Sequence, residues 1–287
     1  MSTFVAISIV IPAHNEETVL ARSLDALVQG ARTGELEIVV VCNGCTDGTA
    51  EVAQGYGDPV RVLEIPQASK TDALNLGDVA VSSFPRFYVD ADVILPLASA
   101  RRIAARLSER DALAAAPVMG LDLRDSSVAV RAYYRIWVRL PYVREGMVGV
   151  GVYALSEEGR RRFGEFPDVI ADDGYVRLLF DARERIRVDD APVHVHAPQS
   201  VSDLVSIKTR SRLGLYQLAG RFPDLFARGR TAKSYGNAMR GIVLRPWLWP
   251  AAAVYATVVL ETRRRARAQL ASVGEYVWAR DQSSRRH

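Results

Sequence analysis

The chain has 287 residues, 49% of them hydrophobic and 24% charged, which is ordinary for a globular protein of one large or two small domains. Its formal net charge of +4 is too small to indicate binding to nucleic acid. The two cysteines, Cys42 and Cys45, do not indicate a secreted disulfide scaffold, and they lack the second pair that a four-ligand zinc site needs. The N-terminus, MSTFVAISIV, lacks the charged region of a signal peptide, and we expect a cytoplasmic protein.

Apolar strand-like segments alternate with amphipathic helix-like segments up to residue 92. Strands are predicted where apolar, often β-branched residues run together, at 7–11, 36–44, 60–66 and 87–92. Helices are predicted between them, at 18–32, 45–57 and 69–83. This alternation predicts an α/β fold with a parallel, doubly wound sheet flanked by helices. Ligands of such sheets bind at the carboxyl ends of the strands.

The pattern is looser after residue 92. A helix is predicted at 97–109, and the aromatic and basic stretch at 126–143 is also predicted to be helical. Strands are predicted at 112–120 and 147–156, and strand pieces at 185–198.

The common nucleotide-binding and hydrolase motifs are missing from the sequence. No G-x-G-x-x-G follows the first strand, and neither a P-loop nor a G-x-S-x-G elbow occurs. The polar residues that remain at the predicted strand ends are mainly acidic.

Asp90 and Asp92 end the fourth predicted strand, in the segment FYVDAD. Side chains alternate along a strand, so both carboxylates point to the same side. Two neighbouring negative charges raise each other's pKa unless a cation lies between them. Oxygen ligands with open positions suit Mg²⁺ or Mn²⁺ shared with a ligand diphosphate. An exposed loop pair or a helix-capping pair is the alternative interpretation.

Six segments together resemble family 2 glycosyltransferases in order and spacing: SIVIPAHNEE, VVVCNGCTDGTAEVA, SKTDALNLG, FYVDAD, GVGVYALS and FPDVIADDGYV. The resemblance covers roughly residues 6–215. It implies the GT-A fold, which is Rossmann-like with a mostly parallel central sheet flanked by helices. It also implies transfer of a sugar from a nucleotide-diphosphate sugar, with inversion at the anomeric carbon. We therefore expect a GT-A glycosyltransferase domain at 1–215.

The resemblance implies where the donor nucleotide and its metal would bind. The expected nucleotide-binding residues follow the predicted strands and are Pro12, His14, Glu16, Asn43, Lys70 and Asp90. The family usually has an acidic pair where this chain has Cys42 and Asn43, so the donor base, uridine or guanosine, stays open. The expected metal ligands are Asp92 and Asp90, with His196 as a further ligand. A solvated histidine on a strand is the alternative for His196.

The resemblance also implies residues for catalysis. Asp172 and Asp173 match an acidic pair whose second member is the catalytic base, so Asp173 is expected to deprotonate an acceptor hydroxyl. A helix N-cap is the alternative for Asp172.

The acceptor and diphosphate regions are expected further along the chain. Gly149 and Gly151 match a segment where the backbone approaches the sugar closely, with a tight strand crossing as the alternative. Arg210 and Arg212 are expected to contact the diphosphate. The Gln and Trp of processive relatives are absent beside them, so polymerisation is not indicated. Acceptor specificity is expected in residues 122–148.

Residues 242–260 form the most hydrophobic stretch of the chain. Arg245 and two prolines interrupt it, and a spanning helix needs about 20 apolar residues. Trp247 and Trp249 suit a membrane interface, and several arginines follow. We expect the extension at 216–287 to be helical, with 242–267 lying on the cytoplasmic face of a membrane. A helix packed on the soluble domain is the alternative.

These observations predict a metal-dependent, inverting glycosyltransferase. It would move a sugar from a UDP- or GDP-sugar to a hydroxyl of a carbohydrate, lipid-linked or small-molecule acceptor. The neutral Asn43 favours a second hypothesis, a non-catalytic nucleotide-sugar-binding or scaffold protein on the same fold. A nucleotidyltransferase would carry a Gly- and Arg-rich phosphate loop after the first strand, and the segment PAHNEE has none.

Overall fold

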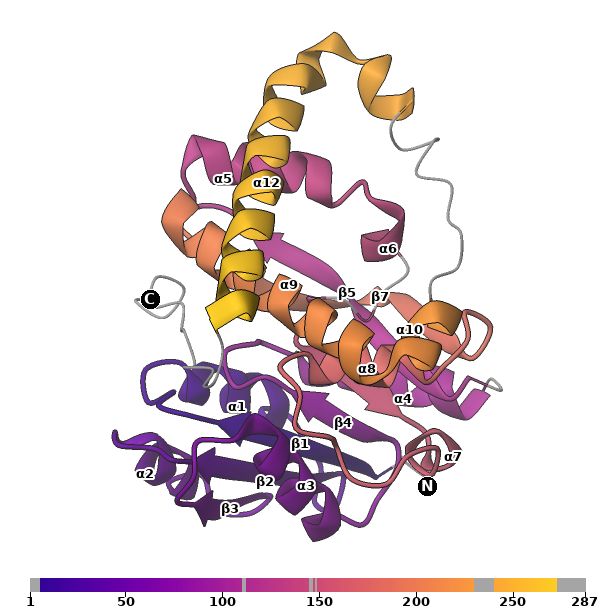
Figure 1. The fold of residues 1–287 in the computed structure, drawn as a ribbon. Coiled ribbons are helices and arrows are strands. Elements are labelled where there is room, and N and C mark those ends of the chain that lie inside the picture. The colour runs from indigo at the N-terminus through magenta and orange to yellow at the C-terminus, as the bar shows by residue number, and fades with distance from the viewer. Residues whose placement is uncertain (1–5, 110–111, 145–146, 148, 230–239, 273–287) are drawn as a thin grey trace.

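The computed structural model describes residues 6–109, 112–144, 147, 149–229 and 240–272. A seven-stranded sheet in the order β3-β2-β1-β4-β6-β5-β7 lies at the centre of the fold (Figure 1). Its strands are β1 (Ile7–Ala13), β2 (Leu36–Asn43), β3 (Val60–Ile65), β4 (Arg86–Val89), β5 (Ala114–Asp122), β6 (Val152–Leu155) and β7 (Arg185–His196). The helices up to β7 are α1 (Leu20–Val28), α2 (Thr49–Gln54), α3 (Lys70–Ala80), α4 (Leu97–Glu109), α5 (Val128–Trp137), α6 (Pro141–Arg144), α7 (Glu157–Arg160) and α8 (Asp172–Leu178).

Strand β1 is buried along its whole length, between β2 and β4, and pairs in parallel with both. Its side chains alternate between two hydrophobic clusters. Ile9 and Ile11 pack with Leu24 of α1, whereas Val10 packs with Leu74 of α3. The uninterrupted apolar run at 7–11 therefore reflects a strand covered by helices on both faces.

The predicted mostly parallel sheet is confirmed, with β6 as the exception to a fully parallel arrangement. Strand β6 pairs antiparallel with both β4 and β5. Strand β7 then pairs in parallel with β5 at the edge, with a register shift between Pro117 and Val118. The segment VYAL of β6 is apolar on both faces, so its sequence carries no information on strand direction.

The C-terminal part continues with α9 (Val201–Arg221), α10 (Pro223–Gly229), the 3₁₀ helix η1 (Pro246–Leu248) and α12 (Trp249–Ser272). Helix α12 lies across α5 and α9 (Figure 1), and the rings of Tyr255 and Tyr133 stack 5.2 Å apart. The predicted domain boundary after residue 215 falls inside α9. Within the described part of the chain, no helix is both long and apolar enough to cross a membrane.

Candidate active site

The end of β4 and the first turns of α3 and α8 meet at Lys70. This residue begins α3, which Ser69 caps by accepting a hydrogen bond from the Asp72 amide. Lys70 Nζ lies 2.7 Å from Asp90 Oδ1, directly after β4, and 2.8 Å from Asp172 Oδ1, at the start of α8. Asp172 is therefore in the first helical turn and paired with a lysine, and the alternative N-cap position belongs to Ala171.

Burial and charge determine the protonation of this cluster. Burial alone would lower the pKa of Lys70, but the carboxylates of Asp172 and Asp90 outweigh it and hold that pKa well above its usual value. The neighbouring Asp173 has a pKa raised to about 6, by burial first and then by the charge of Asp172, with Lys70 opposing. Its Oδ1 accepts a hydrogen bond from the Gly174 amide at 2.7 Å. A carboxylate of this pKa is suited to take up a proton near neutral pH.

A small pocket opens at this cluster. It is lined by Pro12, Lys70, Leu74, Tyr88, Val89, Asp90, Gly151, Tyr153, Asp172 and Asp173. The rings of Tyr88 and Tyr153 stack with their centroids 4.9 Å apart. The Tyr153 hydroxyl is buried and has no hydrogen-bond partner among the described residues, and its pKa is raised by burial and then by Asp172. It is therefore a neutral donor that a bound ligand would satisfy.

Gly151 brings the backbone against Asp90. Its φ is +67°, and an added Cβ would lie 2.6 Å from Val93 Cγ2 and 3.0 Å from Asp90 Oδ2. Its carbonyl accepts a hydrogen bond from the Asp90 amide at 2.8 Å. Gly149 also has a positive φ, +63°, but an added Cβ there would only touch Trp137 at 3.8 Å. The tight approach at Gly151 is thus to Asp90 and Val93, and approach of this segment to a sugar stays a prediction.

The predicted donor-base loop after β1 is tied to the loop after β2. His14 donates from Nδ1 to the Asn43 carbonyl at 2.5 Å, and Asn43 Nδ2 donates to the Ala13 carbonyl at 2.8 Å. The Glu16 amide donates to Thr49 Oγ1 at 2.7 Å. The buried side chain of Asn43 thus closes the two loops on each other. The neutral amide of Asn43 makes this contact without burying a charge. This explains how asparagine can serve at a position where the family usually has an acidic residue.

The predicted metal ligands lie at one end of the sheet. Ile94 forms an antiparallel bridge with His194 of β7, so two residues further out Asp92 and His196 approach the same end. His196 Nδ1 lies 3.7 Å from Asp122 Oδ2. Among the described residues no three His, Cys, Asp or Glu side chains form a ready metal cage. Two carboxylates nevertheless fit Mg²⁺ or Mn²⁺, which commonly completes its shell with substrate phosphates and water.

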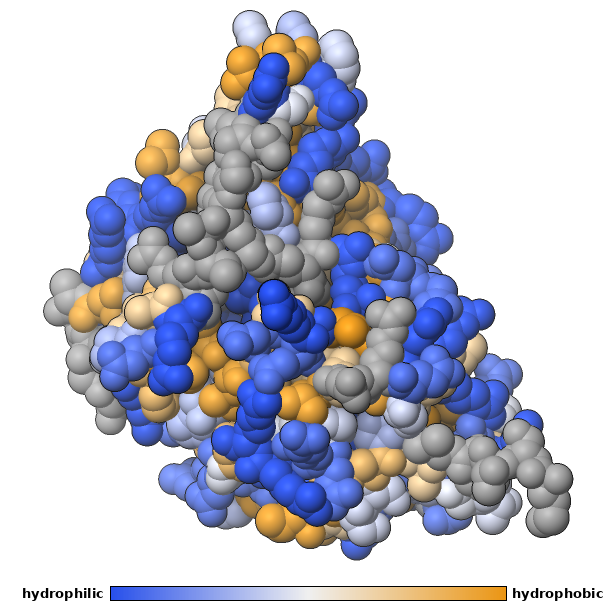
Figure 2. All heavy atoms as spheres, turned by 90° about the vertical axis from the view of Figure 1, so that its right-hand side faces the viewer, coloured by the Kyte–Doolittle hydropathy of each residue, from blue (hydrophilic) through white to orange (hydrophobic). Residues whose placement is uncertain are grey.

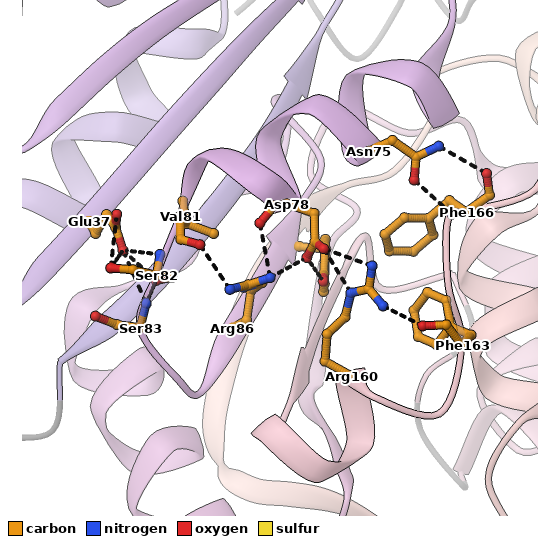
Figure 3. Close-up of polar contacts among 12 residues, drawn as sticks. Glu37, Asn75, Asp78, Val81, Ser82, Ser83, Arg86, Arg160, Phe163 and Phe166 are labelled. Carbon is orange, nitrogen blue, oxygen red and sulfur yellow. Dashed lines mark hydrogen bonds and ion pairs between the residues drawn. The ribbon is translucent and has the colours of Figure 1, made fainter.

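A buried polar network lies behind the pocket (Figure 3). The Asp78 carboxylate accepts hydrogen bonds from Arg86 at 2.6 Å, from the Tyr88 hydroxyl at 2.5 Å and from Arg160 Nε at 2.9 Å. Arg160 also donates to the Phe163 carbonyl and lies 4.3 Å from the centre of that ring. Burial alone would raise the pKa of Asp78, but these donors, Arg160 first, hold it below its usual value. The network fixes Tyr88 in the pocket wall.

Asn75 holds the loop that leads to α8 (Figure 3). Its Nδ2 donates to the Phe166 carbonyl at 3.1 Å, and its Oδ1 accepts from the Phe166 amide at 2.7 Å. The Phe166 ring also meets Tyr88 edge-on at 5.1 Å. Because this anchor lies shortly before Asp172 and Asp173, it restricts the positions that both carboxylates can take.

Arg210 and Arg212 are half-buried on α9, outside the described lining of the pocket. Burial raises the pKa of Tyr133, and the nearby charge of Arg212 partly offsets this. The helix reaches the segment before α8 further along, where an added Cβ at Gly214 would lie 2.7 Å from Ala171 Cβ. Contact of either arginine with a diphosphate stays a prediction.

The sequence model of Glycosyl transferase family 2 matches residues 8–144 of this chain. A curated relative, dolichyl-phosphate beta-glucosyltransferase of Drosophila melanogaster, is 32% identical over 99 residues. That alignment spans 30% of this chain and 30% of the relative's length.

Solved structures share the fold over most of the chain. A mannosyltransferase of Pyrobaculum calidifontis, in complex with GDP-mannose and Mn²⁺, has a TM-score of 0.60 at 20% identity and covers 94% of this chain and 80% of its own. Glucosyl-3-phosphoglycerate synthase of Mycobacterium tuberculosis, in complex with phosphoglyceric acid, has a TM-score of 0.55 at 20% identity and covers 80% of this chain and 82% of its own. Residues 8–144 therefore form a glycosyl transferase family 2 domain, within a chain that has the GT-A fold.

Proposed function

We propose that this chain is a metal-dependent, inverting glycosyltransferase that moves a sugar from a UDP- or GDP-sugar to an acceptor hydroxyl. The observation that carries the proposal is the cluster of Lys70, Asp90 and Asp172 beside Asp173. It combines a carboxylate of raised pKa with a fixed cation and an open pocket at the ends of parallel strands. Solved structures of similar fold support the nucleotide-sugar class, because the mannosyltransferase contains GDP-mannose and a further structure of the synthase contains UDP-glucose.

Asp173 is the proposed catalytic base. The acceptor oxygen forms a bond to the anomeric carbon while the bond from that carbon to the diphosphate breaks. The hydroxyl proton passes to Asp173, and the nucleoside diphosphate leaves with the bonding electron pair. Lys70 supports this role by holding Asp172 in place, so that the charge of Asp172 keeps the pKa of Asp173 raised.

The residues proposed to hold the metal are Asp92, Asp90 and His196. A Mg²⁺ or Mn²⁺ ion bound there would supply positive charge against the diphosphate. Lys70 already pairs with one oxygen of Asp90, and the other oxygen of Asp90 would face the metal or the nucleotide.

Calorimetric titration with UDP and GDP, each with and without Mn²⁺, tests the proposal. We expect one nucleotide to bind in a metal-dependent way, and Asp92→Ala to abolish that binding while the protein stays folded. A screen of the matching nucleotide sugars should then release nucleoside diphosphate. Binding without release in that screen would favour the non-catalytic hypothesis, and release of pyrophosphate would favour a nucleotidyltransferase. No binding of either nucleotide to folded protein would overturn the proposal.

We also propose that the turn before α12 contacts an anionic membrane surface. Ile242 and Leu248 are buried against Ile136 of α5, so one side of this segment packs on the domain. The other side exposes large apolar side chains, Val243 (58%), Leu244 (67%), Trp247 (64%) and Trp249 (56%). Arg240 and Arg245 are exposed beside them. Hydrophobic and hydrophilic residues alternate at this end of the molecule, at the top of Figure 2. Exposed tryptophans flanked by arginines suit the headgroup region of a bilayer.

Sedimentation with vesicles tests this contact. Vesicles containing phosphatidylglycerol should bind the protein, and vesicles of phosphatidylcholine alone should bind it more weakly. The double variant Leu244→Ser with Trp247→Ser should weaken binding at least about tenfold, because each side chain contributes about 1.5–3 kcal/mol when buried. Val79 is 81% exposed on α3, so Val79→Ser is the matched control and should leave binding unchanged. Equal binding of both variants would contradict the proposal.

A further inference from the structure

Lys208 of α9 lies among three aromatic rings. Its Nζ is 4.3 Å from the ring centre of Trp137, 5.5 Å from that of Tyr134 and 5.9 Å from that of Tyr133. All three rings belong to α5 and are buried. Lysine is rare in this chain, which has three lysines among its 37 basic residues. The other described one, Lys70, is in the candidate active site. Lys208 itself is half-buried between the two helices.

No carboxylate pairs with Lys208 in the described part of the chain. The aromatic faces attract its charge, but this contact is weaker than an ion pair in the same place. Burial accordingly lowers the pKa of Lys208 to about 8. A second cation, Arg212, lies one helical turn further along α9 and acts on the same tyrosine, Tyr133. It too forms no ion pair among the described residues. Within the described part of the chain, neither cation thus has a carboxylate partner, and both lie near the same aromatic cluster.

Two contacts place this cluster beside the candidate active site. Trp137 lies next to Gly149, two residues before Gly151, which touches Asp90. On the other side, α9 packs on Ala171, the residue before Asp172, at Gly214. Six residues of helix separate Lys208 from Gly214, a rise of about 9 Å. The same helix therefore carries both cations and the residue that packs beside Asp172.

We propose that Lys208 and Arg212, with Trp137 and Tyr134, form the subsite for a phosphate monoester on the acceptor. The proposal rests on the proposed function, because it names the acceptor class of the same site. A phosphate offers several acceptor oxygens and a double negative charge, which both cations would share. The aromatic rings would cover the carbon atoms that join this phosphate to the reacting hydroxyl. The phosphate could belong to a soluble ester or to a lipid headgroup, and the test separates the two.

The three lysines allow a direct test that does not require turnover. Protein labelled with ¹³C at the lysine ε carbons should give three resolved NMR signals, assigned by replacing each lysine with methionine. We expect glycerol 3-phosphate to shift the Lys208 signal in a saturable way, whereas chloride at the same ionic strength does not. Arg212→Gln should weaken the affinity measured at Lys208 about fivefold or more. Arg135→Gln removes an exposed charge on the outer side of α5 and should leave that affinity unchanged.

The signals of Lys70 and Lys208 separate this proposal from the proposed function. A nucleotide that shifts Lys70 while glycerol 3-phosphate leaves Lys208 unchanged would overturn the subsite alone. Equal weakening by Arg212→Gln and Arg135→Gln would also overturn it, because the overall positive charge of the protein, and not a specific contact, would then attract the phosphate. Dihexanoyl phosphatidic acid below its micelle concentration distinguishes the two sources. Binding tenfold tighter than that of glycerol 3-phosphate would support a lipid acceptor, and equal binding would support a soluble one.

Discussion

Replacement of Gly151 by alanine measures how tightly the backbone is held against Asp90. The left-handed conformation at φ +67° costs alanine about 1–2 kcal/mol relative to glycine. The new Cβ would also lie 2.6 Å from Val93 Cγ2 and 3.0 Å from Asp90 Oδ2. Val93 is buried and has no room to move freely, so overpacking adds about 1–3 kcal/mol. We expect Gly151→Ala to lower the free energy of unfolding by about 2–5 kcal/mol.

Gly149→Ala is the matched control for this prediction. Its φ of +63° imposes the same backbone cost, but its Cβ would make only an ordinary contact with Trp137 at 3.8 Å. Urea denaturation of both variants therefore isolates the steric part. We expect Gly151→Ala to be the less stable by about 1–3 kcal/mol. It should also weaken metal-dependent nucleotide binding in calorimetry, because Asp90 must move. Equal stabilities and equal nucleotide affinities would refute the claim that Gly151 positions Asp90.

Three further substitutions test the charges around the pocket. Asp173→Asn should lower kcat about 10²–10⁴-fold with nucleotide affinity retained. The wild-type rate should fall as the pH drops below about 6, since the base must be unprotonated, and a flat pH–rate profile would argue against Asp173 as the base. Lys70→Met should lower the free energy of unfolding by about 3 kcal/mol in urea denaturation. This loss is smaller than the loss on breaking a fully buried ion pair, because Asp90 keeps some contact with solvent. Asp78→Asn should lower the free energy of unfolding by about 3–5 kcal/mol, because it leaves Arg86 buried without a counterion. An unchanged free energy of unfolding would contradict this and would mean that Arg160 turns out to water. The depressed pKa of Asp78 also means that its contribution is present above the unfolded pKa of about 4 and is lost as the pH falls through the native value.

The first half of the sheet was predictable because its rules are local. Strands β1 and β2 are mostly apolar and buried, and Asp90 directly follows β4, so the sequence places Pro12, Asn43 and Asp90 at one edge. The family resemblance, and not these local rules, predicted roles for Lys70 and Asp172, and both line the pocket.

The rest of the site depends on contacts that no local pattern reveals. Tyr88 and Tyr153 lie in apolar strands and look like core residues; they reach the pocket only because β6 pairs antiparallel with β4 and sets them opposite each other. The pairing of Lys70 with two acids from distant segments is likewise a result of topology. Lys208 is an ordinary helix residue in the sequence, and its aromatic surroundings come from the packing of α5 on α9.

Helix α3 carries Lys70, Leu74 and Asp78 at intervals of four residues, so all three lie on one stripe. The first binds the acids of the site, the second lines the pocket, and the third holds Arg160 and Tyr88 behind it. One inserted or deleted residue between Lys70 and Asp78 would rotate one end of the stripe by about 100° relative to the other. The helix itself would survive such a change, and the site would not. The number of residues between Lys70 and Asp78 is therefore constrained, separately from any constraint on which residues lie between them.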